Sequence, residues 1–141
     1  MSARSDAVLV DTGPLVAVLN GGDEHHAWAR EVFGRLAPPL LTCEAVLSEV
    51  QFLVHDRGGD PLVVLRWVEQ GILKLSFSAE REMQRLISLQ TSYRNLPMDF
   101  ADACLVRMSE TMEACRVLTT DRHFQIYRRN QRRLIPLISP W

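Results

Sequence analysis

The chain has 141 residues, of which 47% are hydrophobic and 23% charged, and its formal net charge is −1. This length suits one compact domain with its own core, and the composition excludes intrinsic disorder, which requires low hydrophobicity and high net charge. The sequence has no run of about 18 apolar residues, so we expect no membrane span. The apolar run before Asp11 is too short for a secretory signal. We therefore expect one domain over residues 1–141, located in the cytoplasm.

The first half of the chain alternates short apolar runs with helical patterns. Residues 7–10 predict a buried strand that is broken by the DTGP segment at 11–14. Helical periodicity follows over residues 24–36, then a short strand over 40–42 and a helix over 44–55. Asp60 and Pro61 are typical of the N-cap and first position of another helix.

The second half repeats the alternation. Residues 72–75 predict a strand, a helical pattern runs through Met83 and Gln90, and residues 99–112 predict a further helix. A strand over 117–119, a short helix over 124–130 and a last strand over 134–138 complete the series. Alternating strands and helices imply parallel pairing, so the predicted fold class is α/β, with a central, mainly parallel sheet of about five short strands in a three-layer α/β/α arrangement.

Two acidic residues follow predicted strands. Asp11 and Asp121 each come at the end of an apolar run, and ligands of open α/β sheets bind beyond the carboxyl ends of the strands. Each residue also has a structural alternative. Asp11 can begin a turn, and Asp121 can cap a helix that begins at Arg122.

Helices provide the other candidate acids. Glu49 shares the apolar face of its predicted helix, where an isolated charge is costly, so it must be paired, protonated or bound to a cation. Asp102 shares a face with Leu105 and Val106. The structural alternative is a capping arrangement, with Asp99 as N-cap and Asp102 in the first turn. Capping is a sufficient explanation for Asp99 and a weaker one for Asp102.

Converging carboxylates repel one another unless cations lie between them. A site with oxygen ligands alone favours Mg²⁺ or Mn²⁺ over zinc, and such a site can activate water for hydrolysis of a phosphodiester. Thr12 and Thr119 adjoin the strand-end acids, and their hydroxyls are candidates for orienting a carboxylate. The three cysteines have no metal-ligand spacing and are predicted to be free thiols.

Arginines cluster near the C-terminus. Arg122, Arg128 and Arg129 are candidate RNA contacts, because a basic patch can hold phosphates. A solvated face of a short helix is the alternative explanation for each of them.

Four segments together resemble the PIN-domain family. They are VLVDTGPL at 8–15, LTCEAVLSEV at 41–50, MDFADA at 98–103 and VLTTDRHF at 117–124. The sequence is most similar to toxins of VapBC-type toxin–antitoxin pairs, and the resemblance covers nearly the whole chain. It implies a Mg²⁺- or Mn²⁺-dependent endoribonuclease, an RNA substrate, a small antitoxin partner and a homodimer.

The resemblance also assigns the acids. The family's first, second and fourth acids fall on Asp11, Glu49 and Asp121, and the third falls on Asp102, with Asp99 as an accessory acid whose order with Asp102 could be reversed. Two other functions are consistent with parts of the sequence. One is a PIN-like module that binds RNA or protein without cleavage. The other is an aspartic protease, because Asp-Thr-Gly follows an apolar run, although those proteases are all-β proteins.

Overall fold

The computed structural model describes residues 6–141, so the first five residues of the predicted domain lie outside the described part. The helices are α1 Thr12–Leu19, α2 His26–Arg35, α3 Glu44–Asp56, α4 Leu62–Glu69, α5 Met83–Ser92 and α6 Phe100–Glu110. The strands are β1 Ala7–Val10, β2 Leu40–Thr42, β3 Leu73–Leu75, β4 Cys115–Leu118, β5 Arg128–Arg129, β6 Arg133–Leu134 and β7 Leu137–Ile138. Over residues 6–141, no helix is long and apolar enough to cross a membrane.

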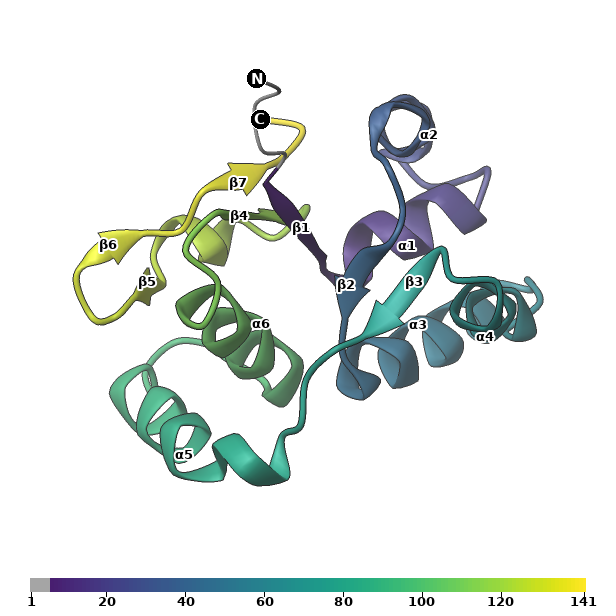
Figure 1. Cartoon of the computed structure of the whole chain (residues 1–141). Coiled ribbons are helices and arrows are strands. Elements are labelled where there is room, and N and C mark those ends of the chain that lie inside the picture. Colours follow the sequence, from purple (N-terminus) through teal and green to yellow (C-terminus); the bar gives the residue numbers. More distant parts are fainter. Residues whose placement is uncertain (1–5) are drawn as a thin grey trace, which may run out of the picture.

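A five-stranded sheet forms the centre of the molecule, in the order β3-β2-β1-β4-β7 (Figure 1). Every neighbouring pair in this sheet is parallel, and helices flank it. The predicted α/β fold with a parallel sheet of short strands is therefore confirmed. An aspartic protease would require an all-β fold, so that alternative is wrong.

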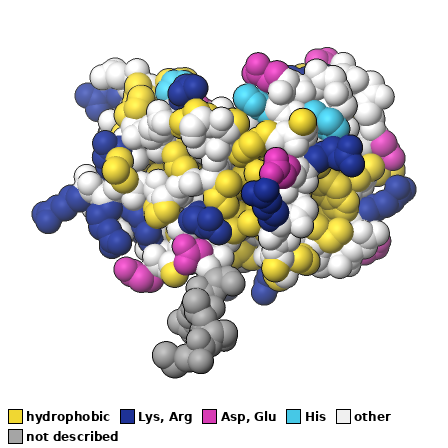
Figure 2. All heavy atoms as spheres, turned by 90° about the horizontal axis from the view of Figure 1, so that it is seen from above, with side chains coloured by type: hydrophobic (Ala, Val, Ile, Leu, Met, Phe, Trp, Pro, Cys, Tyr) yellow, Lys and Arg dark blue, Asp and Glu magenta, His cyan; other side chains and the backbone are white. Residues whose placement is uncertain are grey.

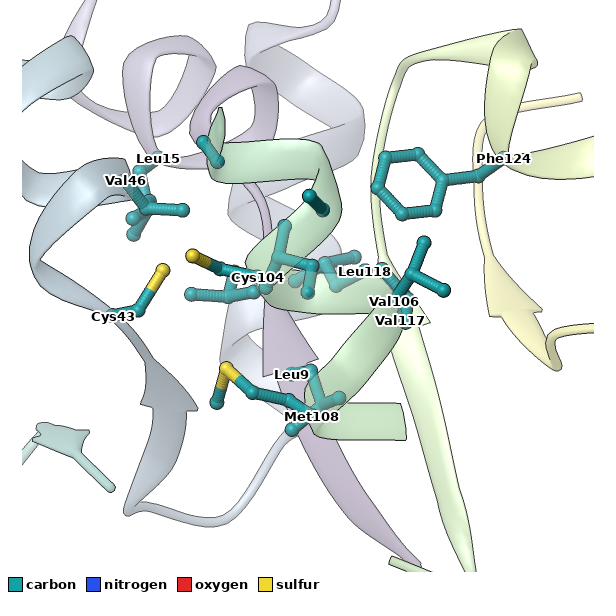
Figure 3. Close-up of a cluster of buried hydrophobic side chains, with 14 of the residues drawn as sticks. Leu9, Leu15, Cys43, Val46, Cys104, Val106, Met108, Val117, Leu118 and Phe124 are labelled. Atoms are coloured by element: carbon teal, nitrogen blue, oxygen red, sulfur yellow. The ribbon is translucent and has the colours of Figure 1, made fainter. Parts of the chain in front are cut away.

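The core lies between the central strands and the helices that pack on them. Leu9 of β1 and Val117 and Leu118 of β4 are completely buried. Figure 3 shows Val117 and Leu118 near Val106 of α6 and Leu9 near Met108, with the sulfur atoms of Cys43 and Cys104 pointing toward one another. All three cysteines are buried free thiols, as predicted. Because β1 and β4 are anchored by this burial, the residues at their carboxyl ends have fixed positions.

Helix α1 begins directly after β1 and was not predicted from the sequence. The segment after Asp11 contains Gly13 and Pro14, which usually interrupt regular structure. Pro14 nevertheless lies in the first turn, where a backbone N–H has no partner within the helix and its loss costs little. The turn predicted at Asp11 is therefore the N-terminus of a helix.

The C-terminal region differs from the prediction in two places. The predicted helix over 124–130 is wrong, because a 3-10 turn over Arg122–Gln125 leads instead into a β5–β6 hairpin. Residues 130–132 connect its strands, and within them Asn130 and Gln131 have φ values of 54° and 67°. The predicted strand over 134–138 is interrupted at Pro136, which has no N–H to donate, although its carbonyl accepts a hydrogen bond from Val117 at 2.8 Å.

Candidate active site

Asp11 lies between the carboxyl end of β1 and the N-terminus of α1. Its side chain is buried, with Oδ1 accepting from the Thr12 backbone N–H at 2.7 Å and Oδ2 accepting from the Thr119 hydroxyl at 2.7 Å. Burial raises the pKa of Asp11 to about 6, and the two hydrogen bonds oppose this shift by stabilising the charged form. Asp11 is therefore a carboxylate oriented through both oxygens.

Thr119 connects Asp11 to Asp121. Strands β1 and β4 are parallel neighbours, which brings their carboxyl ends together. The Thr119 hydroxyl donates its hydrogen to Asp11, and its oxygen accepts a hydrogen bond from the Asp121 backbone N–H at 2.9 Å. Oδ1 of Asp121 accepts the backbone N–H of His123 at 2.9 Å and lies 2.7 Å from Nδ1 of the same residue. The structural alternative for Asp121, a helix cap, is thus present, although the element that it caps is a 3-10 turn.

Glu49 approaches from α3 and is half-buried. The Thr12 hydroxyl donates to its Oε2 at 2.8 Å. Burial raises the pKa of Glu49 to about 7, with further contributions from the Asp99 carboxyl and the Asp11 charge. The two threonines proposed from the sequence therefore each orient one acid: Thr12 binds Glu49, and Thr119 binds Asp11.

Asp99 and Asp102 form a capping box at the start of α6. The Asp99 side chain accepts from the Asp102 N–H at 2.8 Å, and the Asp102 side chain accepts from the Asp99 N–H at 3.3 Å. Asp102 is buried and also receives the Tyr127 hydroxyl at 3.3 Å, whereas Asp99 is exposed. Burial, followed by the Asp11 and Asp99 charges, raises the pKa of Asp102 to about 8. Asp99 and Asp102 therefore cap α6 and also belong to the acidic cluster.

The five predicted acids converge on one region of the molecule. Asp99 and Asp121 contribute to the raised pKa values of both Asp11 and Asp102, and Asp99 and Asp11 contribute to that of Glu49. Mutual repulsion of this kind is relieved by a cation, and an all-oxygen donor set suits a hard divalent ion. Within residues 6–141, however, no group of three or more acidic, histidine or cysteine side chains is already arranged to hold a metal ion.

The three candidate RNA-binding arginines have different environments. The Arg122 guanidinium lies 4.8 Å from the centre of the Trp141 ring. Arg128 donates to backbone carbonyls of its own turn, including those of Gln125 and Ile126 at 2.8 Å. Figure 2 shows Lys and Arg side chains gathered on the left of the view, the side on which β5 and β6 lie in Figure 1.

Arg129 does not fit the predicted contact with RNA. Its side chain is only 2% exposed, and its guanidinium donates to the Met112 carbonyl at 2.6 Å and the Glu113 carbonyl at 3.3 Å. It also donates to the carbonyl of Ser109 in the last turn of α6, which has no N–H partner within the helix, whereas the other two carbonyls lie in the loop after α6. Arg129 is a structural residue, so this prediction is wrong for Arg129.

Sequence reasoning did not identify Tyr127 as a residue of the site. Tyr127 is completely buried, donates to Asp102 and packs edge-on against Phe124 and Tyr93. Burial and the neighbouring acids raise the pKa of its phenol well above the ordinary value, so the group stays a proton donor. In the sequence Tyr127 lies among arginines in the helix predicted over 124–130, and nothing in that pattern indicates a contact with Asp102.

Comparisons with known proteins show the family and the fold of the chain. A family model described as the PIN domain matches residues 8–130. The chain belongs to the PIN-domain family. Ribonuclease VapC26 of Mycobacterium tuberculosis is 28% identical to it over 124 residues, which cover 86% of this chain and 92% of the relative. The crystal structure of VapC20 from the same organism, described as a Sarcin-Ricin loop cleaving toxin, has a TM-score of 0.75 at 21% identity.

The likeness to VapC20 covers 90% of this chain and 99% of that one, and it shows the fold. The predicted membership of the PIN-domain family is thus confirmed. All five acids of the cluster lie within the matched residues of this PIN domain: Asp11, Glu49, Asp99, Asp102 and Asp121.

Proposed function

We propose that this PIN domain is a metal-dependent endoribonuclease, a single domain over the whole chain that acts as the toxin of a type II toxin–antitoxin pair in the cytoplasm. The observation that carries the proposal is the pair of threonine-oriented acids. Thr119 holds Asp11 and Thr12 holds Glu49, each through one hydroxyl. Such hydrogen bonds are typical of carboxylates that must keep a fixed orientation toward a metal ion. The similarity to ribonuclease VapC26 supports RNA as the substrate.

Mg²⁺ or Mn²⁺ is the proposed cofactor, and the carboxylates of the cluster would hold it: Asp11, Asp102, Glu49, Asp99 and Asp121. When bound, such an ion lowers the pKa of water and stabilises charge that develops at phosphorus. The chain's own contribution is orientation. Thr119 fixes one oxygen of Asp11, and the capping box fixes Asp102. The acids hold charge at the site and do not attack the phosphodiester themselves.

The proposal is tested by RNA cleavage with and without divalent ions. We expect cleavage in Mg²⁺ or Mn²⁺, loss of cleavage in EDTA, and recovery when the ion is added in excess. The alternative, a PIN-like module that binds RNA without cleaving it, predicts binding in all conditions and cleavage in none. Cleavage that continues unchanged in EDTA would contradict the metal-dependent mechanism.

The antitoxin partner and the homodimer are proposed by analogy with the toxins that the chain resembles. We expect expression of the wild-type chain to arrest bacterial growth and expression of Asp11→Asn to leave growth unaffected. The homodimer is tested separately, because light scattering of the purified protein should then give the mass of two chains. Growth arrest by the inactive variant would argue against RNA cleavage as the toxic activity.

A further inference from the structure

Phe52 is an exposed aromatic residue beside the acidic cluster. It lies on α3 three residues after Glu49, so the two side chains share one face of the helix. Its side chain is 69% exposed, more than any other large hydrophobic side chain among residues 6–141. Single exposed hydrophobic residues are common on protein surfaces, so exposure alone would mean little. The position of Phe52 in a pocket is what gives it significance.

That pocket has a volume of about 480 Å³ and is lined by Ser48, Glu49, Phe52, Leu53 and Asp99. Its lining residues are of two chemical kinds. Glu49 and Asp99 belong to the acidic cluster, whereas Phe52 and Leu53 provide an apolar wall. The pocket is an open hollow, so a flat group can enter it from the surface and lie against Phe52. A ligand that fits has a flat apolar group next to a group that approaches the carboxylates through a cation.

We propose that Phe52 is a positioning residue on which an unpaired nucleobase next to the cleaved phosphodiester stacks. This inference rests on the proposed ribonuclease function and assigns a role in it to a side chain outside the acidic cluster. Aromatic side chains stack on any base, because every base has a π face. In a duplex both faces of each base are already stacked on neighbouring bases, so a paired base cannot use Phe52 without unstacking.

A nucleobase is favoured over an apolar side chain of a partner protein. Docking of a protein requires a broad contiguous surface, and the exposed Leu62 and Leu65 of α4 line a separate depression with Arg66 and Glu69. The Phe52 wall instead continues directly into Glu49 and Asp99. In a nucleotide the base and the phosphate lie close together. The base can therefore contact Phe52 while the phosphate lies near the acids, where a cation would separate the like charges.

The test uses three substitutions of Phe52 and one control. Phe52→Trp keeps an aromatic face, Phe52→Leu keeps an apolar side chain without one, and Phe52→Ala removes both. Ile87→Ala removes another exposed apolar side chain, 60% exposed, from α5 and is the matched control. We expect wild-type kcat/KM for Phe52→Trp and Ile87→Ala on a short single-stranded RNA. Phe52→Leu and Phe52→Ala should lose about 5- to 100-fold, mainly through KM.

A binding measurement separates this proposal from the ribonuclease function. It uses the Asp11→Asn background and a single-stranded RNA that carries the fluorescent base 2-aminopurine. The fluorescence should be quenched when Phe52 is retained and in the Phe52→Trp variant, and not in the Phe52→Leu variant. Absence of cleavage by the wild type would overturn the proposed function while this quenching still reports stacking. The stacking role would be overturned if the Phe52→Leu variant cleaved RNA at the wild-type rate and quenched the fluorescence as the wild type does. It would also be overturned if duplex and single-stranded RNA were cleaved equally well.

Discussion

The Thr119 hydroxyl donates a hydrogen bond of 2.7 Å to Oδ2 of Asp11, a residue 108 positions earlier in the chain. The bond joins the carboxyl ends of the neighbouring parallel strands β1 and β4. Burial raises the pKa of Asp11, and this hydrogen bond partly offsets that rise. The bond therefore favours the charged carboxylate that a metal ion requires. The order of strands in the sheet is therefore linked directly to the chemistry of the site.

Thr119→Val tests this link. The valine has nearly the same shape but cannot donate, so Asp11 loses its orientation and its charged form is less favoured. We expect metal affinity or cleavage to fall about 10- to 100-fold, as for other residues that orient metal ligands. Calorimetric titration with Mn²⁺ and single-turnover cleavage would measure the change. Thr91→Val, on the exposed side of α5, is the matched control and should leave both values unchanged.

Gly13 allows α1 to pack closely against the segment after β4. A Cβ atom at position 13 would lie 2.0 Å from Oγ1 of Thr120, which is closer than atoms can approach. We expect Gly13→Ala to lower the free energy of unfolding by about 1–3 kcal/mol, the usual effect of overpacking. The double variant Gly13→Ala/Thr120→Ala should recover part of this loss, because it removes the oxygen.

Gly34 supplies the control for that experiment. It lies in α2, and nothing stands within 4 Å of an added Cβ. Gly34→Ala should therefore stabilise the protein by about 0.5–1 kcal/mol through helix propensity. Urea denaturation measures all three variants. Equal stability of Gly13→Ala and Gly34→Ala would contradict the close packing of α1 on Thr120.

The acidic cluster makes the stability of the metal-free protein depend on pH. The folded-state pKa values of Asp11, about 6, and Asp102, about 8, are above the ordinary 3.8, so the folded protein binds protons more tightly than the unfolded chain. The contribution of these two groups to the free energy of unfolding is fully present below about pH 4, and it is lost as the pH rises toward 8. We expect a loss on the order of 1–3 kcal/mol in EDTA between pH 5 and pH 9.

Asp102→Asn isolates this effect, because an amide keeps the shape and stays neutral. In EDTA the variant should lose less stability than the wild type between pH 5 and pH 9. Mn²⁺ should stabilise the wild type at pH 9 and have a smaller effect on the variant. Urea denaturation provides the measurement. If the wild type were equally stable at both pH values in EDTA, burial and the neighbouring charges would not raise the pKa values of Asp11 and Asp102 as described.

Arg129 and Arg132 should behave in opposite ways. Arg129→Met leaves the carbonyls after α6 without their donor, so we expect the free energy of unfolding to fall by about 2–4 kcal/mol. The folded variant should bind RNA like the wild type. Arg132 is exposed, and Arg132→Ala should weaken RNA binding and its salt dependence modestly without changing stability. Normal stability with weak RNA binding in Arg129→Met would contradict the structural role.

The sequence allowed most of the fold and the acids to be predicted, because both depend on local pattern. Strand ends are marked by apolar runs, so Asp11 and Asp121 were found, and the helical period placed Glu49 on the inner part of α3. Helix α1 was missed because Gly13 and Pro14 are read as breaks, although the first turn of a helix tolerates them. Local pattern gave no information about contacts between distant residues, which is why the burial of Arg129 and the contact of Tyr127 with Asp102 emerged only from the structure.

Cleavage of RNA by Asp11→Asn is the most direct measurement of the central claim, that oriented carboxylates provide the activity. Asparagine keeps the size of the side chain and can accept the N–H of Thr12, so the fold should remain intact, as circular dichroism can verify. We expect cleavage in Mg²⁺ or Mn²⁺ to fall by about 100-fold or more while RNA is still bound. Cleavage equal to that of the wild type in a folded Asp11→Asn protein would contradict the proposed mechanism.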